Sequence, residues 1–331
     1  MRVLLGIVAV FFCWTCFSVG QALAANNGLS LAGKPQFSLT APKSKLSYKH
    51  VHGFKADIPA NLTPFARPVL PGEGTWRLVE SVHGEPAVFA TFMRVDAVHT
   101  SYVAGIASFD QRLVKFQLHP GSQDPGTGFG GGQPWIPPGD RTGLLATFNG
   151  GFRLSASRGG FYFNGATSGT LTSGAASVVY YRNGTIRIGQ WGRDVTMSPE
   201  VMGVRQNLKL IVDHGKVAPD INQDVEANFG ATLGGTYVVW RSGLGITRDG
   251  RVIYVYGPAL SAQSLADLLL RAGAVEAMEL DINPFWTTFE YYQSRGHPVD
   301  PAPVVLLPDR QTPAYRYYSP YSRDFNAVYA R

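Results

Sequence analysis

Short apolar alternations, broken by glycine, asparagine and aspartate, run through the middle of this sequence and limit the folds open to it. The clearest ones lie at residues 113–118, 144–148, 177–181 and 185–188. Apolar side chains at every second position are typical of half-buried strands rather than helices. The dipeptides Asn149-Gly150, Asn183-Gly184 and Asp249-Gly250 fall between such runs, and they suit the positive φ angles of tight hairpin turns. The pattern therefore predicts a β-rich protein.

Only one segment has a convincing helical pattern. It begins near Ser261, whose hydroxyl can cap free backbone NH groups, and it stops at Gly273. Its apolar positions at helical spacing are Leu265, Leu268, Leu269 and Ala272. We therefore predict an α+β or mixed α/β fold, in which one β-rich domain has a large mixed sheet and few helices.

Residues 1–25 have the form of a signal peptide. One positive charge at Arg2 precedes an apolar stretch at residues 3–19, and the run ALAA at 22–25 offers a cleavage site near Ala24 or Ala25. The alternative is an uncleaved anchor, because the apolar stretch is close to the minimum length for spanning a bilayer. Both cysteines lie within residues 1–25, so the mature chain is expected to have no disulfide and no cysteine metal site.

Removal of this segment is expected to leave a secreted or extracytoplasmic protein with no stable membrane span. Residues 26–75 are rich in Pro, Lys and Asn and show little periodicity, so we predict a linker and an irregular lead-in there. Residues 76–331 are predicted to form the folded domain, and a hydrophobic fraction of 45% is ordinary for a chain with a real core.

The charge distribution bears on the class of partner. The formal net charge is +6, and it is spread without runs of Lys or Arg, so nucleic-acid binding is not expected. A mild positive field favours anionic polymers or phosphorylated glycans instead. Asp281 and Asn283 have the alternate spacing seen in calcium loops, but no further oxygen ligands follow at the expected positions. We therefore predict neither a metal nor another cofactor.

Two carboxylates and an amide occur where a predicted strand gives way to a loop, in the run ELDINP at 279–284. Side chains alternate across a strand, so Glu279 and Asp281 are expected on one face, with their roots roughly 6.6 Å apart. Paired carboxylates at about that separation suit sugar chemistry. The alternative is two solvent-facing acids on a half-exposed strand.

Four motifs occur in an order known from one protein family. They are TFNGGF at 147–152, VWRSGLG at 239–245, the Asp249-Gly250 turn, and ELD at 279–281 after the predicted helix. Together they resemble the phosphodiester glycosidase family, whose usual signatures are Asn-Gly-Gly-Phe-Phe, Arg-Thr-Ala-Ile-Gly followed by Asp-Gly, and Asn-Leu-Asp-Gly-Gly-Gly-Ser-Ser. The resemblance covers about residues 95–289, with a weaker echo of the family's terminal strand at 322–325.

The chain departs from the family at the last motif. Where the family has Asp-Gly-Gly-Gly-Ser-Ser, this sequence has DINPFW at 281–286, so bulky and rigid residues replace a glycine-built backbone cradle. Pro284 has no NH group to offer a phosphate. The family's Asn before Leu-Asp is Glu279 here, and the Thr after Arg is Ser242, which keeps a hydroxyl.

The resemblance implies cleavage of a sugar 1-phosphodiester, which releases a good leaving group and needs cations for the departing phosphate. Arg241 is the predicted phosphate clamp, because a guanidinium forks onto two oxygens; the alternative is a structural ion pair. Asp281 is predicted to act on the sugar or on its attacking water. Glu279 is predicted to be a second acid or an orienting hydrogen-bond partner, and the two roles are exchangeable.

The residues predicted to bind substrate are Asn149, Gly150, Gly151, Ser242, Asn283 and Trp286. Asn149 and the two glycines after it can combine a side-chain amide with close backbone approach, although a simple hairpin turn is the alternative. Trp286 either packs on the apolar face of a pyranose or fills core volume. His214 is a reserve acid or base, against a structural or solvated role.

We therefore expect a secreted hydrolase that cleaves a sugar 1-phosphodiester bond in glycan, cell-wall or exopolysaccharide material. Asn149, Arg241 and Asp281 should converge at strand ends to form its site. Two alternatives stay open. One is a non-catalytic glycan-binding or wall-polymer-binding protein on the same scaffold. The other is a divergent glycosidase for ordinary linkages, prompted by the pair Glu279 and Asp281.

Overall fold

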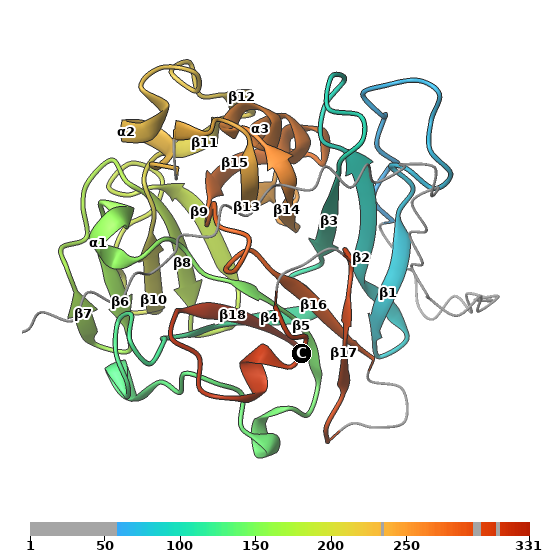
Figure 1. Cartoon of the computed structure of the whole chain (residues 1–331). Coiled ribbons are helices and arrows are strands. Elements are labelled where there is room, and N and C mark those ends of the chain that lie inside the picture. The colour runs from blue at the N-terminus through green and yellow to red at the C-terminus, as the bar shows by residue number, and fades with distance from the viewer. Residues whose placement is uncertain (1–57, 233–234, 294–298, 309–311) are drawn as a thin grey trace, which may run out of the picture. The chain divides into compact units, whose positions relative to one another are not determined.

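Strands make up most of the regular structure of this protein (Figure 1). The computed structural model describes residues 58–331 except 233–234, 294–298 and 309–311. The predicted signal peptide and the lead-in up to residue 57 lie outside the described residues. The described residues all belong to a single compact unit.

The largest sheet has eight strands, and each strand runs antiparallel to its neighbours. In spatial order they are β1 (Arg77–Val82), β2 (Glu85–Arg94), β3 (Val103–Phe109), β14 (Val252–Leu260), β13 (Val239–Thr247), β15 (Ala274–Glu279), β11 (Leu210–Asp213) and β12 (Lys216–Val217). Strand β13 therefore lies inside the sheet, between β14 and β15.

Two further sheets have five strands each, again with antiparallel neighbours. One has the order β7 (Ala166–Ser168), β6 (Phe161–Phe163), β10 (Val201–Gln206), β8 (Ala176–Tyr181) and β9 (Ile186–Gln190). The other has the order β17 (Ala302–Val305), β16 (Phe289–Gln293), β5 (Leu144–Asn149), β18 (Phe325–Ala330) and β4 (Val114–His119).

The expectation of a β-rich protein with few helices is confirmed, whereas that of one large mixed sheet is wrong. The described strands form three antiparallel sheets. Short turns explain the difference, because Asn183-Gly184 joins β8 to β9 and Asp249-Gly250 joins β13 to β14. Gly184 and Gly250 have φ angles of 81° and 85°, as tight hairpins need. Parallel neighbours would need longer crossover connections.

Helix α3 (Ala262–Arg271) confirms the helix expected near Ser261. The Ser261 hydroxyl accepts a hydrogen bond from the Ser264 NH at 3.0 Å, and the helix ends before Gly273, whose φ is 94°. The other helices are short: α1 (Leu154–Ser157), α2 (Val225–Phe229), and the 3-10 turns η1 (Phe129–Gly131), η2 (Pro138–Asp140) and η4 (Arg316–Tyr318). In the part of the chain that the structure describes, no helix has the length and hydrophobicity to cross a bilayer.

Strand β14 contacts both the apolar cluster around α3 and aromatic residues of a second sheet. Its residues Ile253 and Val255 belong to the apolar cluster that holds the leucines of α3, which lies against the eight-stranded sheet (Figure 1). The alternating residue Tyr254 has its ring centre 4.7 Å from that of Phe148 on β5 and 5.7 Å from that of Phe289 on β16. Aromatic contacts of this kind tie the largest sheet to the one containing β5.

Residues 58–75 contain no helix or strand, yet they pack on the rest of the unit. The Trp76 indole NH donates to the Ala60 carbonyl at 3.0 Å, and Leu62 is buried. Glu73 forms a buried ion pair of 2.8 Å with Arg94 on β2. The folded part of the chain therefore includes contacts from before residue 76.

Replacing Leu268 by alanine should test the role of α3. Leu268 is fully buried, so its loss should lower the free energy of unfolding by about 2–5 kcal/mol in urea denaturation. The control is Leu270→Ala on the same helix, where the side chain is only partly buried and the loss should be less than half as large. Equal losses would contradict the packing described for this helix.

Candidate functional site

Arg241 and Glu279 form a buried ion pair between neighbouring strands β13 and β15. Arg241 Nη1 donates to Glu279 Oε1, and Arg241 Nε donates to the Leu260 carbonyl at 2.9 Å. Burial raises the pKa of Glu279, and the guanidinium opposes that rise. Because both side chains are fully buried and engaged with each other, they act here as a structural pair.

The side chain of Asn149, at the end of β5, is also committed to internal contacts. Its amide NH₂ donates to Ser242 Oγ at 3.0 Å and to the Gly150 carbonyl at 2.7 Å. Its carbonyl oxygen accepts from the Tyr254 hydroxyl at 2.6 Å and from the Thr288 NH at 3.2 Å. Asn149 thus connects β5 to β13 and β14, which belong to another sheet.

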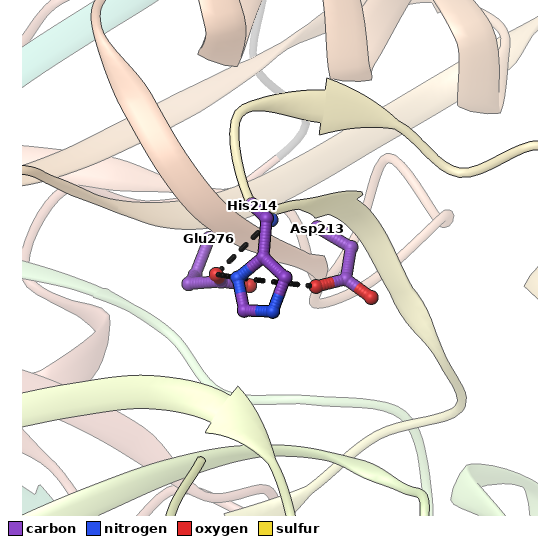
Figure 2. Close-up of side chains that lie close together, drawn as sticks. All are labelled: Asp213, His214 and Glu276. Atoms are coloured by element: carbon purple, nitrogen blue, oxygen red, sulfur yellow. Dashed lines mark hydrogen bonds and ion pairs between the residues drawn. The ribbon is translucent and has the colours of Figure 1, made fainter. Parts of the chain in front are cut away.

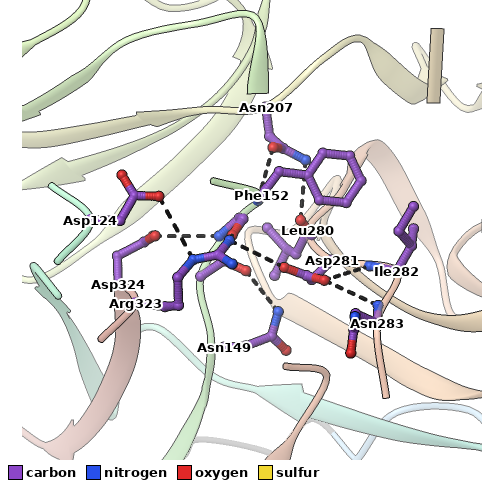
Figure 3. A network of polar contacts seen from close by, with 12 residues as sticks. Asp124, Asn149, Phe152, Asn207, Leu280, Asp281, Ile282, Asn283, Arg323 and Asp324 are labelled. Atoms are coloured by element: carbon purple, nitrogen blue, oxygen red, sulfur yellow. Dashed lines mark hydrogen bonds and ion pairs between the residues drawn. The ribbon is translucent and has the colours of Figure 1, made fainter. Parts of the chain in front are cut away.

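Ser242 extends this hydrogen-bond network to the residues just beyond β15. Its NH donates to the Asp281 carbonyl and its carbonyl accepts from the Leu280 NH, both at 2.8 Å. From the other side, the Asn207 amide donates to the carbonyls of Glu279 and Leu280 at 2.8 and 3.2 Å (Figure 3). The backbone that bears Asp281 is therefore fixed from two directions.

The Asp281 carboxylate is buried but lines a cleft. It accepts hydrogen bonds from the NH groups of Ile282 and Asn283 at 2.8 and 3.1 Å, and from Arg323 Nη2 at 3.4 Å (Figure 3). Burial raises the pKa of Asp281 to about 7, although Arg323 and the two NH groups oppose the rise and Glu279 adds to it. A carboxyl group that titrates near neutral pH can serve as a general acid or base.

Arg323, two residues before the start of β18, is the cation beside Asp281. Figure 3 shows its guanidinium between Asp124 and Asp281. Its Nη2 donates to the Gly151 carbonyl at 2.8 Å, and its Nε lies 3.7 Å from Asp124 Oδ2. The guanidinium carbon lies 5.1 Å from the ring centre of Trp286, close enough for a cation–π contact. The site residues predicted from the sequence do not include Arg323.

Gly150 and Gly151 are needed because other groups approach the backbone closely. A Cβ atom on Gly150 would lie 1.9 Å from Asp324 Oδ2, and one on Gly151 would lie 2.9 Å from the guanidinium carbon of Arg205. Arg205 and Asp324 form a buried ion pair of 2.9 Å. The hairpin turn expected at Asn149-Gly150 is wrong, because β5 pairs with β16 and β18 and not with the strand that follows it.

The cleft that Asp281 lines has a volume of about 630 Å³, within the range of ligand sites. Its polar and aromatic lining residues include Asp281, Glu226, Arg153, Arg158, Arg323, Asn283, Phe152 and Trp286. Three guanidinium groups favour an anionic ligand, and the two aromatic rings offer an apolar face. No carboxylate of the described residues pairs with the exposed Arg153 or Arg158.

The predicted site residues therefore divide into two groups. Asp281, Asn283 and Trp286 line the cleft. The others lie outside its lining: Glu279, Arg241, Asn149, Gly150, Gly151 and Ser242. Two cleft residues missing from the predicted site had a signal in the sequence: Phe152 ends the TFNGGF motif, and Arg323 lies in the echo of the terminal strand at 322–325. Arg153, Arg158 and Glu226 had none.

His214 lies in the turn between β11 and β12 and takes no part in lining the cleft. Its Nδ1 is 2.8 Å from Glu276 Oε1 and 3.7 Å from Asp213 Oδ1 (Figure 2). These three residues could together approach a metal ion, but Arg193 already donates to both oxygens of Asp213, at 2.9 and 2.7 Å. The Asp213 carboxylate is thus already paired within the protein.

Comparisons with known proteins give only distant similarities. No protein-family model and no curated protein matches the sequence. Among solved structures, the chain is similar to the catalytic domain of zebrafish N-acetylglucosamine-1-phosphodiester alpha-N-acetylglucosaminidase, auto-inhibited by its pro-peptide. The identity is 14% and the TM-score 0.47, over 77% of this chain and 87% of that one. A hypothetical protein from Synechocystis gives 11% identity and a TM-score of 0.39, over 76% of this chain and 64% of that one.

The raised pKa of Asp281 predicts a pH-dependent loss of stability. The carboxyl has a pKa of about 7 in the folded state against 3.8 for the ordinary group, so the folded state binds the extra proton between these values. The contribution of Asp281 to the free energy of unfolding should therefore fall by up to ~4 kcal/mol as pH rises from about 4 to 7, and then stay level.

Asp281→Asn removes this titration, so its stability relative to the parent should increase from pH 4 to pH 7 in urea denaturation. The matched control is Asp249→Asn in the exposed turn between β13 and β14, which should show no such trend. A constant difference between Asp281→Asn and the parent across this pH range would contradict the predicted titration.

Proposed function

We propose that this protein is a hydrolase that cleaves a sugar 1-phosphodiester in the cleft lined by Asp281. The observation that carries the proposal is a carboxyl group with a pKa of about 7, held beside Arg323 in a cleft that Arg153 and Arg158 also line. Cations for a phosphate and a proton-accepting group for water are the two requirements of this reaction.

In the proposed reaction the sugar ring lies against the aromatic faces of Phe152 and Trp286. Its phosphate lies against the arginines. A water oxygen attacks the anomeric carbon while ionised Asp281 takes the water proton. The bond from that carbon to the phosphate oxygen breaks, and the bonding electrons leave with the phosphomonoester. A phosphate is a stable leaving group, so the step needs little help from a general acid.

The second carboxylate of the proposed site is Glu226, in the first turn of α2. It lines the same cleft as Asp281, whereas Glu279 is engaged by Arg241. We assign Glu226 to a sugar hydroxyl or to stabilisation of the positive charge that develops on the sugar. The proposed substrate is glycan, cell-wall or exopolysaccharide material outside the cell, in line with the predicted signal peptide.

One feature of the chain favours a second candidate function, namely binding without turnover. Pro284 and its bulky neighbours replace the glycine cradle typical of the family that the sequence resembles. A scaffold that has lost those phosphate contacts can keep affinity for an anionic glycan through its arginines. The two functions make different predictions for Asp281. A hydrolase needs this residue for turnover, whereas a binding protein keeps its affinity without it.

Hydrolysis by the purified mature chain should be measured with a panel of UDP-sugars and methyl diesters of sugar 1-phosphates, with free sugar as the readout. Asp281→Asn should lower kcat about 100-fold or more, because it removes the proton acceptor. Arg323→Gln should lower kcat/KM about 100-fold through lost stabilisation of the phosphate. Arg248→Gln, in the exposed turn after β13, is the control and should change neither.

Release of sugar from alkyl glycosides at the same rate would favour an ordinary glycosidase. Binding of wall polymers without release from any diester would favour the binding function.

The pH dependence of kcat/KM should show whether Arg323 acts on the pKa of Asp281 or only stabilises the fold. Because Asp281 must be ionised, kcat/KM should fall about tenfold per pH unit below about 7. Arg323 lowers the pKa of Asp281, so Arg323→Gln should move this limb to higher pH. Arg323→Lys keeps the charge and should move it less. An unshifted limb in Arg323→Gln would exclude the proposed coupling.

A further inference from the structure

A second, smaller cleft adjoins the one that contains Asp281. Its volume is about 300 Å³, and the two clefts share the lining residues Arg158 and Leu208. Arg158 caps the C-terminus of α1, where its φ of 55° fixes the chain in a left-handed turn. The two clefts therefore meet at a cationic residue.

The lining of the second cleft differs chemically from that of the first. Besides Arg158, its polar lining residues are Lys209, Thr172, Ser173 and Asn228. It has no carboxylate and no aromatic ring, in contrast to the first cleft. Two cationic residues among polar ones suit a hydrated anionic group rather than an apolar sugar face.

Lys209 can bind such a group with little loss of stability, because its ion pair with Asp220 is exposed. Its Nζ lies 2.7 Å from Asp220 Oδ2, but the two side chains are 52% and 32% exposed. Ion pairs between exposed groups contribute little to stability, since water and salt compete with them. A phosphate in the second cleft can share or replace the Asp220 carboxylate as the partner of Lys209.

We propose that the second cleft binds the neighbouring phosphate-bearing unit of a polymeric substrate. This rests on the proposed function of the first cleft, and it narrows the substrate class to a glycan with repeating phosphodiester links. In such a chain the group beyond the cleaved phosphate carries the next phosphate. Arg158 lies between the two units, while Lys209 contacts only the second.

The test compares synthetic sugar 1-phosphate methyl diesters of one unit and of three phosphodiester-linked units. The parent should have a higher kcat/KM for three units than for one. Lys209→Ala should lower the ratio of these two values about fivefold, the size expected for one exposed ion pair. Ser173→Phe fills the second cleft without changing charge and should lower the ratio as well. The control Lys216→Ala on β12 removes an exposed lysine elsewhere and should leave the ratio unchanged.

Binding of the same two diesters to Asp281→Asn, by calorimetry, keeps this inference separate from the hydrolase proposal. Tighter binding of three units, weakened by adding Lys209→Ala, supports the second site even if no diester is cleaved. In that case the hydrolase proposal alone fails. Equal affinity for one and three units, or a preference that Lys209→Ala and Ser173→Phe leave intact, would overturn the second site whatever the turnover.

Discussion

The hydrogen bonds of one buried amide, that of Asn149, hold the candidate site in register. This side chain is only 3% exposed, and it joins β5 to Ser242 on β13 and to Tyr254 on β14. A buried polar group left without partners costs about 1–3 kcal/mol, so the two sheets favour the one relative position that satisfies it. Since Ser242 in turn binds the backbone of Asp281, the place of that carboxylate depends on this connection.

The alternation of side chains along β13 separates residues that stabilise the fold from those that connect to the candidate site. Arg241 and Ser242 are neighbours on β13, so their side chains point to opposite faces. Arg241 pairs with Glu279, and Ser242 meets Asn149. Strand β15 ends at Glu279, and Asp281 lies two residues beyond it. One carboxylate is therefore compensated in the interior, and the other borders a cleft.

The sequence predicts local features of this fold better than distant ones. Helix α3 and the turn at Asp249-Gly250 follow from capping and turn chemistry within a few residues, and the structure confirms both. Asp281 and Trp286 were recognisable because motif order pointed to their loop. Arg158 was not, and Arg323 had only the weak echo at 322–325, because the tertiary fold brings these arginines into the cleft of Asp281 from separate segments. The antiparallel sheets also depend on strand order, which alternation alone does not specify.

The backbone of the corner, residues 282–286, limits how this cleft can hold a phosphate. Its NH groups at 282, 283, 285 and 286 all donate to Asp281 or Asn283, at 2.8–3.1 Å, and Pro284 has none. No backbone donor of this corner is left for a ligand, so recognition of an anion falls to side chains. Guanidinium groups on flexible stems tolerate several phosphate positions, unlike a rigid cradle of NH groups. If the cleft holds the phosphate of the proposed substrate in this way, it suits units that vary in position, as those of a polymer do.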